Sequence, residues 1–285
     1  SLFYNKKISK IDDKAITYKP RQNILNCIIK FDKKKTNIED YSLNSVWKKG
    51  TNLNYKEFKK LHSFFWLFTL DLKSSKKITQ NIISNWIYEN DRYKQDVWDL
   101  DVLSKRIIAW ISNSRLTYEN SDINYKLKFN SVIKKQTNHL INEIKSSDKL
   151  DDKMIGSTAI ILVGLSYEDK YYLKFGIELL KKILDLSLDT ENFPKSRNLR
   201  QLVFYLKYLV VVREFLKESQ TSVPEFLDEA IFYLGKSYNL LCANIKRGIL
   251  FNGNFEDSNK EFDDYLSLNQ YKFKDDINEI GGYVV

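Results

Sequence analysis

Polar and basic side chains gather where an apolar helical run begins, in the stretch FPKSRNLRQLVFYLKYLVVVREFL at residues 193–216. Five of them fall at or near the predicted start of the helix: Lys195, Arg197, Asn198, Arg200 and Gln201. Cations are misplaced at this end unless a negative group joins them, because free backbone N–H groups and the helix dipole there favour an anion. An arginine can bind a carboxylate or sulfate through two hydrogen bonds. The stretch therefore predicts a site for an acidic ligand.

The alternative for this stretch is a solvated loop whose cations pair with carboxylates that precede it. The candidate partners are Asp185, Asp189 and Glu191.

A second stretch, WDLDVLSKRIIAWISN at residues 98–113, combines aromatic and cationic groups. Trp98, Trp110 and Arg106 are candidates for a wall that stacks on sugar rings and pairs with their acidic groups. In the alternative, both tryptophans are core residues and Arg106 pairs with a neighbouring aspartate, Asp99 or Asp101. The core interpretation is favoured for Trp110, whereas Trp98 is kept as a binding candidate.

Residues for acid–base or metal chemistry are scarce. The chain has two histidines, His62 and His139, and each is most simply a histidine packed on a helix face. Two histidines cannot form a histidine-rich metal cluster, and the sequence contains no HExxH, P-loop, GxGxxG or GxSxG pattern. We therefore expect no metal and no cofactor.

The composition indicates that long helices position these residues. The 285 residues include only 9 Gly and 3 Pro, while 43% are apolar and 14% aromatic, which favours helices around a real core. Apolar spacing of three and four residues begins near residue 55 and predicts roughly eight helices of ~12–20 residues. We expect an all-α fold of antiparallel helical hairpins. The helical stretches are YKEFKKLHSFFWLFTLDL, ITQNIISNWIYEN, SKRIIAWISNSRL, KFNSVIKKQTNHLINEIK, KMIGSTAIILVGLSY, YYLKFGIELLKKILDLSL, the stretch at residues 193–216 quoted above, and PEFLDEAIFYLGKSYNLLCANI.

This pattern divides the chain into three predicted parts. Residues 1–54 form an irregular N-terminal segment and residues 55–250 a helical domain. Residues 251–285 form a linker that ends in a strand, INEIGGYVV. No apolar run is long enough to span a membrane.

The formal net charge of +9 favours a polyanionic partner, such as nucleic acid, anionic lipid or acidic polysaccharide. A Lys-rich solvated surface is the other explanation of this charge. Since the sequence contains no recognition-helix pattern and no aromatic RNA-binding motif, we expect no nucleic-acid partner.

Five stretches, in the same order, resemble the heparinase II/III family of polysaccharide lyases. They are YKEFKKLHSFFWLFTL, WDLDVLSKRIIAWIS, NFPKSRNLRQLVFYLKYL, GILFNGNFED and GGYVV. The third is similar to the family's Gly-Gly-His-x-Ser-Arg-Asn-Pro segment and the helix after it. Ser196, Arg197 and Asn198 match that segment, and Pro194 stands where histidine is usual.

The resemblance implies an (α/α) toroid followed by a large antiparallel β-domain. Residues 55–250 then correspond to the toroid, and the chain ends where the β-domain begins. We therefore expect an incomplete toroid of antiparallel hairpins, with the C-terminal β-sandwich absent or only begun. The resemblance also implies export, so we expect a periplasmic location.

The family's reaction is β-elimination on uronate-containing chains, in which a base removes the C5 proton and an acid protonates the leaving oxygen. Family members use an Asn-His pair and a tyrosine. Here Asp151, Asp152 and Lys153 stand in the place of the pair, and no tyrosine occupies the matching place near Arg200 or Gln201. The sequence therefore names no catalytic residue.

The resulting prediction is a polysaccharide lyase, or its substrate-binding toroid, whose partner is an acidic polysaccharide. Lys195 and Arg197 would bind carboxylate or sulfate, and Asn198 and Gln201 would bind sugar hydroxyls. Trp98 would stack on a sugar ring, with Arg106 beside it. The alternative is a non-catalytic helical module that binds a polyanion or a protein partner.

Overall fold

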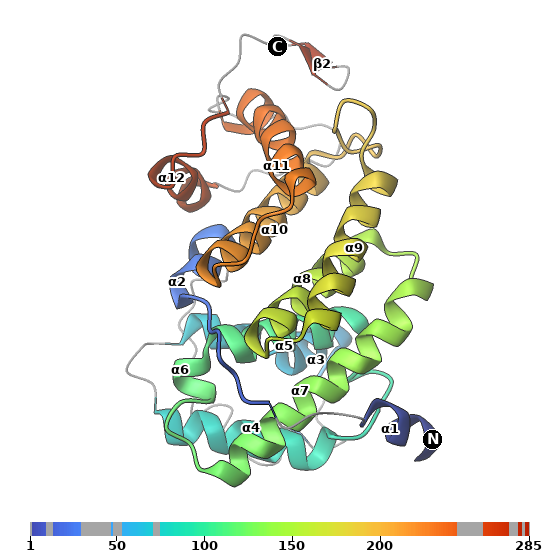
Figure 1. The fold of residues 1–285 in the computed structure, drawn as a ribbon, viewed down its shortest axis with the longest axis vertical. Helices are drawn as coiled ribbons and strands as arrows, with labels where there is room; N and C mark the ends of the chain where they lie inside the picture. Colours follow the sequence, from blue (N-terminus) through green and yellow to red (C-terminus); the bar gives the residue numbers. More distant parts are fainter. Residues whose placement is uncertain are drawn as a thin grey trace. The chain divides into compact units, whose positions relative to one another are not determined.

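Helices make up most of the protein in the computed structural model, which confirms the all-α prediction (Figure 1). The chain divides into two compact units. Unit 1 comprises Ser1–Gln22 and Phe31–Gly176, and unit 2 comprises Asn23–Lys30 and Ile177–Val285. The structure describes residues 2–9, 14–29, 47, 53–70, 75–243, 259–273, 279–280 and 283–284.

Unit 1 is built around two helices, α5 (Leu100–Ser112) and α8 (Leu150–Ser166), which pack against each other. Every residue of α8 from Met154 to Ser166 is buried, as expected for a helix that is apolar on all sides. The helices around this pair are α1 (Leu2–Ile8), α3 (Tyr55–Ser63), α4 (Lys76–Asn90), α6 (Ser114–Thr117) and α7 (Ile123–Glu143), with 3₁₀ turns η3 (Phe65–Thr69) and η4 (Ile144–Ser146).

The chain passes from unit 1 to unit 2 within α9 (Lys170–Ser187). In unit 2, α10 (Leu199–Glu218) and α11 (Glu225–Tyr238) lie side by side (Figure 1). The remaining elements of this unit are α2 (Gln22–Ile28), a π-helical turn η5 (Asn239–Ala243), α12 (Lys260–Leu268), and the strands β1 (Glu279–Ile280) and β2 (Tyr283–Val284).

Polar side chains attach the segment after α11 to α10. The Tyr271 hydroxyl donates to the Glu214 carboxylate at 2.6 Å, and Lys207 donates to Asn259 at 2.8 Å. Glu214 is buried, so its carboxylate is held by hydrogen bonds rather than by water. Burial and the neighbouring Glu214 carboxylate raise the pKa of Tyr271.

The helix predicted from residue 55 through the aromatic run is broken at Phe64. Phe64 adopts a left-handed conformation with φ 57°, which ends α3. Its ring stacks on Trp47 at 5.4 Å and meets Trp110 edge-on at 5.2 Å. Aromatic contacts thus outweigh the local preference for a continuous helix.

The segments predicted to be irregular contain short helices. Residues 1–54 include α1 and α2, and the predicted linker includes α12. The predicted terminal strand is a pair of two-residue antiparallel strands, in which Glu279 pairs with Val284 and Ile280 with Tyr283. The whole GILFNGNFED stretch, residues 248–257, lies outside the described residues. The predicted domain boundaries at residues 54 and 250 stay predictions.

Candidate ligand-binding cleft

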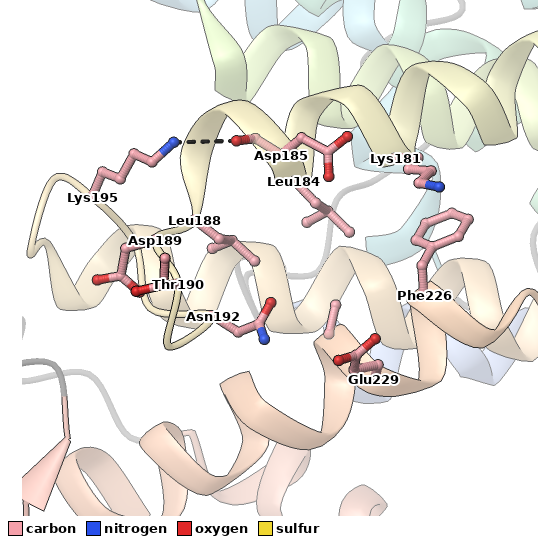
Figure 2. Close-up of a pocket in the computed structure, with 11 residues that line it drawn as sticks. Lys181, Leu184, Asp185, Leu188, Asp189, Thr190, Asn192, Lys195, Phe226 and Glu229 are labelled. Atoms are coloured by element: carbon pink, nitrogen blue, oxygen red, sulfur yellow. Dashed lines mark hydrogen bonds between the residues drawn. The ribbon is translucent and has the colours of Figure 1, made fainter.

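An open cleft of about 680 Å³ lies within unit 2, between the C-terminal half of α9, the loop after it and the start of α11 (Figure 2). We call it the α9–α11 cleft. Four apolar residues line it: Leu184, Leu188, Phe226 and Ala230. Seven polar or charged residues line the rest: Lys181, Asp185, Asp189, Thr190, Asn192, Lys195 and Glu229. An apolar lining with several polar groups suits a ligand that has both apolar and polar faces.

The loop at residues 188–198 is held by its own hydrogen bonds. The Asp189 carboxylate accepts the backbone N–H groups of Glu191 at 2.9 Å and Phe193 at 3.0 Å, a turn typical of aspartate. The backbone N–H of Lys195 donates to the carbonyl of Ser187 at 2.8 Å, which closes the base of the loop. Thr190 and Asn192 therefore line the cleft from an ordered loop.

Arg197 stabilises this loop. A guanidinium nitrogen lies 2.8 Å from the Asp189 carboxylate, and the guanidinium lies 5.3 Å from the centre of the Phe193 ring. This ion pair is the one that the loop interpretation of the sequence predicts for Asp189. The predicted contact between Arg197 and a ligand stays a prediction; its side chain is 42% exposed while paired.

Lys195 is bound to the end of α9. Its ammonium donates to the backbone carbonyl of Leu186 at 3.0 Å. It also donates to the backbone carbonyl of Asp185 at 3.2 Å, the hydrogen bond drawn in Figure 2. A cation at a helix C-terminus is favoured by the dipole and satisfies carbonyls that have no partner within the helix. The sequence places Lys195 near the start of α10, where a cation is unfavourable, but the structure places its charge at the end of α9.

Asn198 and Gln201 organise the start of α10. The Asn198 side chain accepts the backbone N–H of Arg200 at 2.9 Å and is the N-cap of the helix. The Gln201 side-chain oxygen accepts the hydroxyl of Ser196 at 2.6 Å. Neither residue lines the α9–α11 cleft. Their predicted contacts with sugar hydroxyls stay predictions, and the observed contacts are structural.

The cleft carries charges of both signs. Lys181 lies on α9 with its ammonium 5.9 Å from the centre of the Phe226 ring. Asp185 and Glu229 are exposed, and within the described part of the chain neither carboxylate has an ion-pair partner. The sequence analysis did not identify Lys181, Phe226 or Glu229, because only the packing of α11 beside α9 brings them to one cleft.

The structure corrects the prediction for Trp98 and Arg106. Trp98 is 1% exposed and its indole N–H donates to the carbonyl of Asn90 at 3.1 Å, so it has no free face for a sugar. Arg106 is 0% exposed. Trp110 is also buried, as its core interpretation predicts. Both predicted binding residues therefore belong to the core of unit 1.

Arg106 is held by neutral acceptors and not by an aspartate. Its three nitrogens donate to the side-chain oxygen of Gln136 at 3.1 Å, the carbonyl of His62 at 2.8 Å and the carbonyl of Val97 at 3.1 Å. The guanidinium lies 4.2 Å from the centre of the Trp86 ring. Burial lowers the pKa of Arg106. The alternative pairing with Asp99 or Asp101 is wrong among the described residues, since these carboxylates pair with Lys59 and Lys105.

Both histidines are buried, as their helix-face interpretation predicts. Burial, helped by the Arg106 charge, lowers the pKa of His62 to about 3, and its Nδ1 accepts the indole N–H of Trp86 at 3.1 Å. Burial also lowers the pKa of His139, whose Nδ1 lies 2.6 Å from the Tyr4 hydroxyl. Neither histidine lines the α9–α11 cleft.

Asp151, Asp152 and Lys153, which the sequence resemblance aligns with an Asn-His pair, lie at the start of α8, in unit 1. Asp152 is half-buried there, and burial together with the nearby Asp101 carboxylate raises its pKa. No grouping of three or more His, Cys, Asp or Glu in the described residues is suited to hold a metal ion. The helices in the described parts of the chain are all too short or too polar to cross a membrane.

The features of the cleft are therefore an ordered loop, an aromatic ring, two lysines and exposed carboxylates. No family model, curated protein or solved structure matches the chain.

Proposed function

We propose that this chain is the helical part of a heparinase II/III-like protein, with its helices in the (α/α) toroid of that family, and that the α9–α11 cleft binds an acidic polysaccharide. The observation that carries the proposal is the position of the Ser196-Arg197-Asn198 segment. This segment bears the most specific part of the resemblance, and it forms the C-terminal end of the loop that lines the cleft. Arg197 also holds that loop through Asp189.

The chemistry of the lining suits a sugar chain. Lys181 and Lys195 supply positive charge for a carboxylate, and Asn192 offers both a donor and an acceptor for hydroxyl groups. Phe226 is half-buried and supplies an aromatic surface against which the apolar face of a sugar ring can pack.

Binding is proposed in preference to cleavage. Elimination needs a base placed at the C5 proton and an acid at the leaving oxygen. The titratable groups that line the cleft are two lysines and three carboxylates, and no histidine or tyrosine is among them. Tyr205 and Tyr208, on the helix that follows the loop, are buried.

The experiment is titration calorimetry of the whole chain with heparin, heparan sulfate, hyaluronan and alginate. The same mixtures are followed by ultraviolet absorbance for unsaturated uronate. We expect binding of at least one uronate polymer without growth of that absorbance. The variant Lys181→Ala should bind about tenfold more weakly, since loss of one charge-assisted contact of about 1.4 kcal/mol has this effect.

The matched control is Lys182→Ala, which removes an equal charge from the next residue of α9 outside the cleft. Equal losses in the two variants would mean a diffuse effect of net charge and would contradict a site in the cleft. A rise in the absorbance of unsaturated uronate would show that the chain is a lyase and not only a binding module. The absence of binding to every polymer would reject the proposed function.

A further inference from the structure

The charges around the α9–α11 cleft are nearly balanced. Lys181 and Lys195 contribute two positive charges, while Asp185, Asp189 and Glu229 contribute three negative ones. The Asp189 charge is paired with Arg197 at 2.8 Å. Asp185 and Glu229 remain exposed and, within the described residues, without an ion pair. A ligand therefore meets two cations and two available carboxylates.

This balance distinguishes two kinds of acidic polysaccharide. From it we infer that the cleft selects a uronate chain with one carboxylate per disaccharide over a heavily sulfated chain; this inference rests on the proposed function. Like charges at contact distance repel, and such repulsion is a strong source of selectivity. A chain that carries sulfates on most of its rings brings some of them against Asp185 or Glu229.

A sparsely charged chain avoids this repulsion and uses the same carboxylates. Sugar hydroxyls donate hydrogen bonds to ionised carboxylates, and such charge-assisted bonds are stronger than neutral ones. Asp185 and Glu229 thus become acceptors for hydroxyl groups, while the uronate carboxylate lies on an ammonium.

The neighbourhood of Lys181 identifies the position for the uronate ring. Its ammonium lies 5.9 Å from the centre of the Phe226 ring, so an aromatic surface and a cation are adjacent. A uronate ring has the same two features, an apolar C–H face and a carboxylate on its edge. Lys195 is less available, because its ammonium already donates to two backbone carbonyls.

The test compares hyaluronan and heparin fragments of equal length by titration calorimetry of the whole chain, at low and at moderate salt. We expect the hyaluronan fragment to bind about tenfold more tightly at both salt concentrations. In Glu229→Gln, heparin affinity should rise several-fold while hyaluronan affinity stays within about twofold, so that the preference narrows. The matched control is Glu225→Gln, an exposed residue one turn earlier in α11 and outside the cleft, which should leave the preference unchanged.

The outcomes separate this inference from the function on which it rests. If neither fragment nor any other polymer binds, the proposed function fails. If heparin binds as tightly as hyaluronan or more tightly, the chain binds polysaccharide but the selection inferred here is wrong. Equal changes for both fragments in Glu229→Gln would also overturn it. Circular dichroism confirms that each variant is folded, which is expected because both glutamates are exposed.

Discussion

The guanidinium of Arg197 and the carboxylate of Asp189 lie 2.8 Å apart, and this ion pair joins the two ends of the loop that lines the cleft. Arg197 occupies a left-handed conformation with φ 54°, which costs about 1–2 kcal/mol for a residue other than glycine. The loop therefore keeps an arginine at a position whose backbone favours glycine.

This conflict predicts an order of stability among variants of Arg197. Arg197→Ala loses the ion pair and retains the unfavourable backbone conformation. Arg197→Gly loses the pair but relieves the backbone, so it should be about 1 kcal/mol more stable than the alanine variant. Urea unfolding followed by circular dichroism measures the difference. Asp189→Asn serves as the control, since it keeps an oxygen for the turn and loses only the half-exposed ion pair; a change of about 1 kcal/mol or less is expected.

The buried guanidinium of Arg106 predicts a large loss of stability on truncation. Arg106→Ala leaves three acceptors without donors and opens a cavity beside Trp86, and should lower the free energy of unfolding by about 3–5 kcal/mol. Arg106→Lys should still lose about 2 kcal/mol, because one ammonium cannot reproduce the planar fork of donors. The exposed Arg115→Ala should change stability by about 0.5 kcal/mol or less. A small effect of Arg106→Ala would show that the network adds little to stability.

The buried His62 predicts a loss of stability in acid. Its pKa is about 3 in the folded chain and 6.5 when unperturbed, so the unfolded state takes up the proton first. The contribution of neutral His62 to the free energy of unfolding is complete above pH 6.5. It is lost as the pH falls from 6.5 towards 3, by at most about 1.4 kcal/mol per pH unit. Comparison of unfolding curves for the native chain and His62→Gln isolates this contribution. The difference between them should vary with pH in that window, and a constant difference would contradict the assignment.

Asp152 predicts the opposite dependence of stability on pH: its effect on the free energy of unfolding becomes less unfavourable as the pH falls. Its folded pKa is raised by burial and by Asp101, so ionisation at neutral pH opposes folding, and this cost disappears as the pH falls to the ordinary range of aspartate. Asp152→Asn should therefore be about 0.5 kcal/mol more stable than Asp151→Asn at pH 7. Both changes remove a charge from the first turn of α8, so their common effect on the helix dipole cancels. The advantage should vanish near pH 3, and its persistence there would assign it to another cause.

The sequence predicted the long helices well because their apolar spacing extends over several turns. The pattern from Leu199 onward, for example, corresponds to α10, and the run from Met154 corresponds to the buried α8. Helices α1 and α2, with 7 residues each, are too short to give a clear period. The break at Phe64 depends on Trp47 and Trp110, which are distant in sequence.

The site was harder to predict because its residues are explained by distant partners. The sequence assigned Lys195 to the start of α10, whereas its ammonium binds carbonyls at the end of α9. Arg106 has a side chain of the kind that binds acidic ligands, but in the core its guanidinium donates hydrogen bonds to two backbone carbonyls and to Gln136. Spacing along the chain cannot reveal either arrangement, nor that Phe226 lies opposite α9.

All residues that line the α9–α11 cleft belong to unit 2. A ligand that binds there adds its binding free energy to every opening reaction that destroys the cleft, and to no other. Amide hydrogens in α11 and the C-terminal half of α9 should then exchange more slowly with solvent, while amide hydrogens that exchange through openings that leave the cleft intact keep their rates. Slower amide exchange around the cleft thus reports that a ligand is bound there, whatever the chemical identity of the ligand.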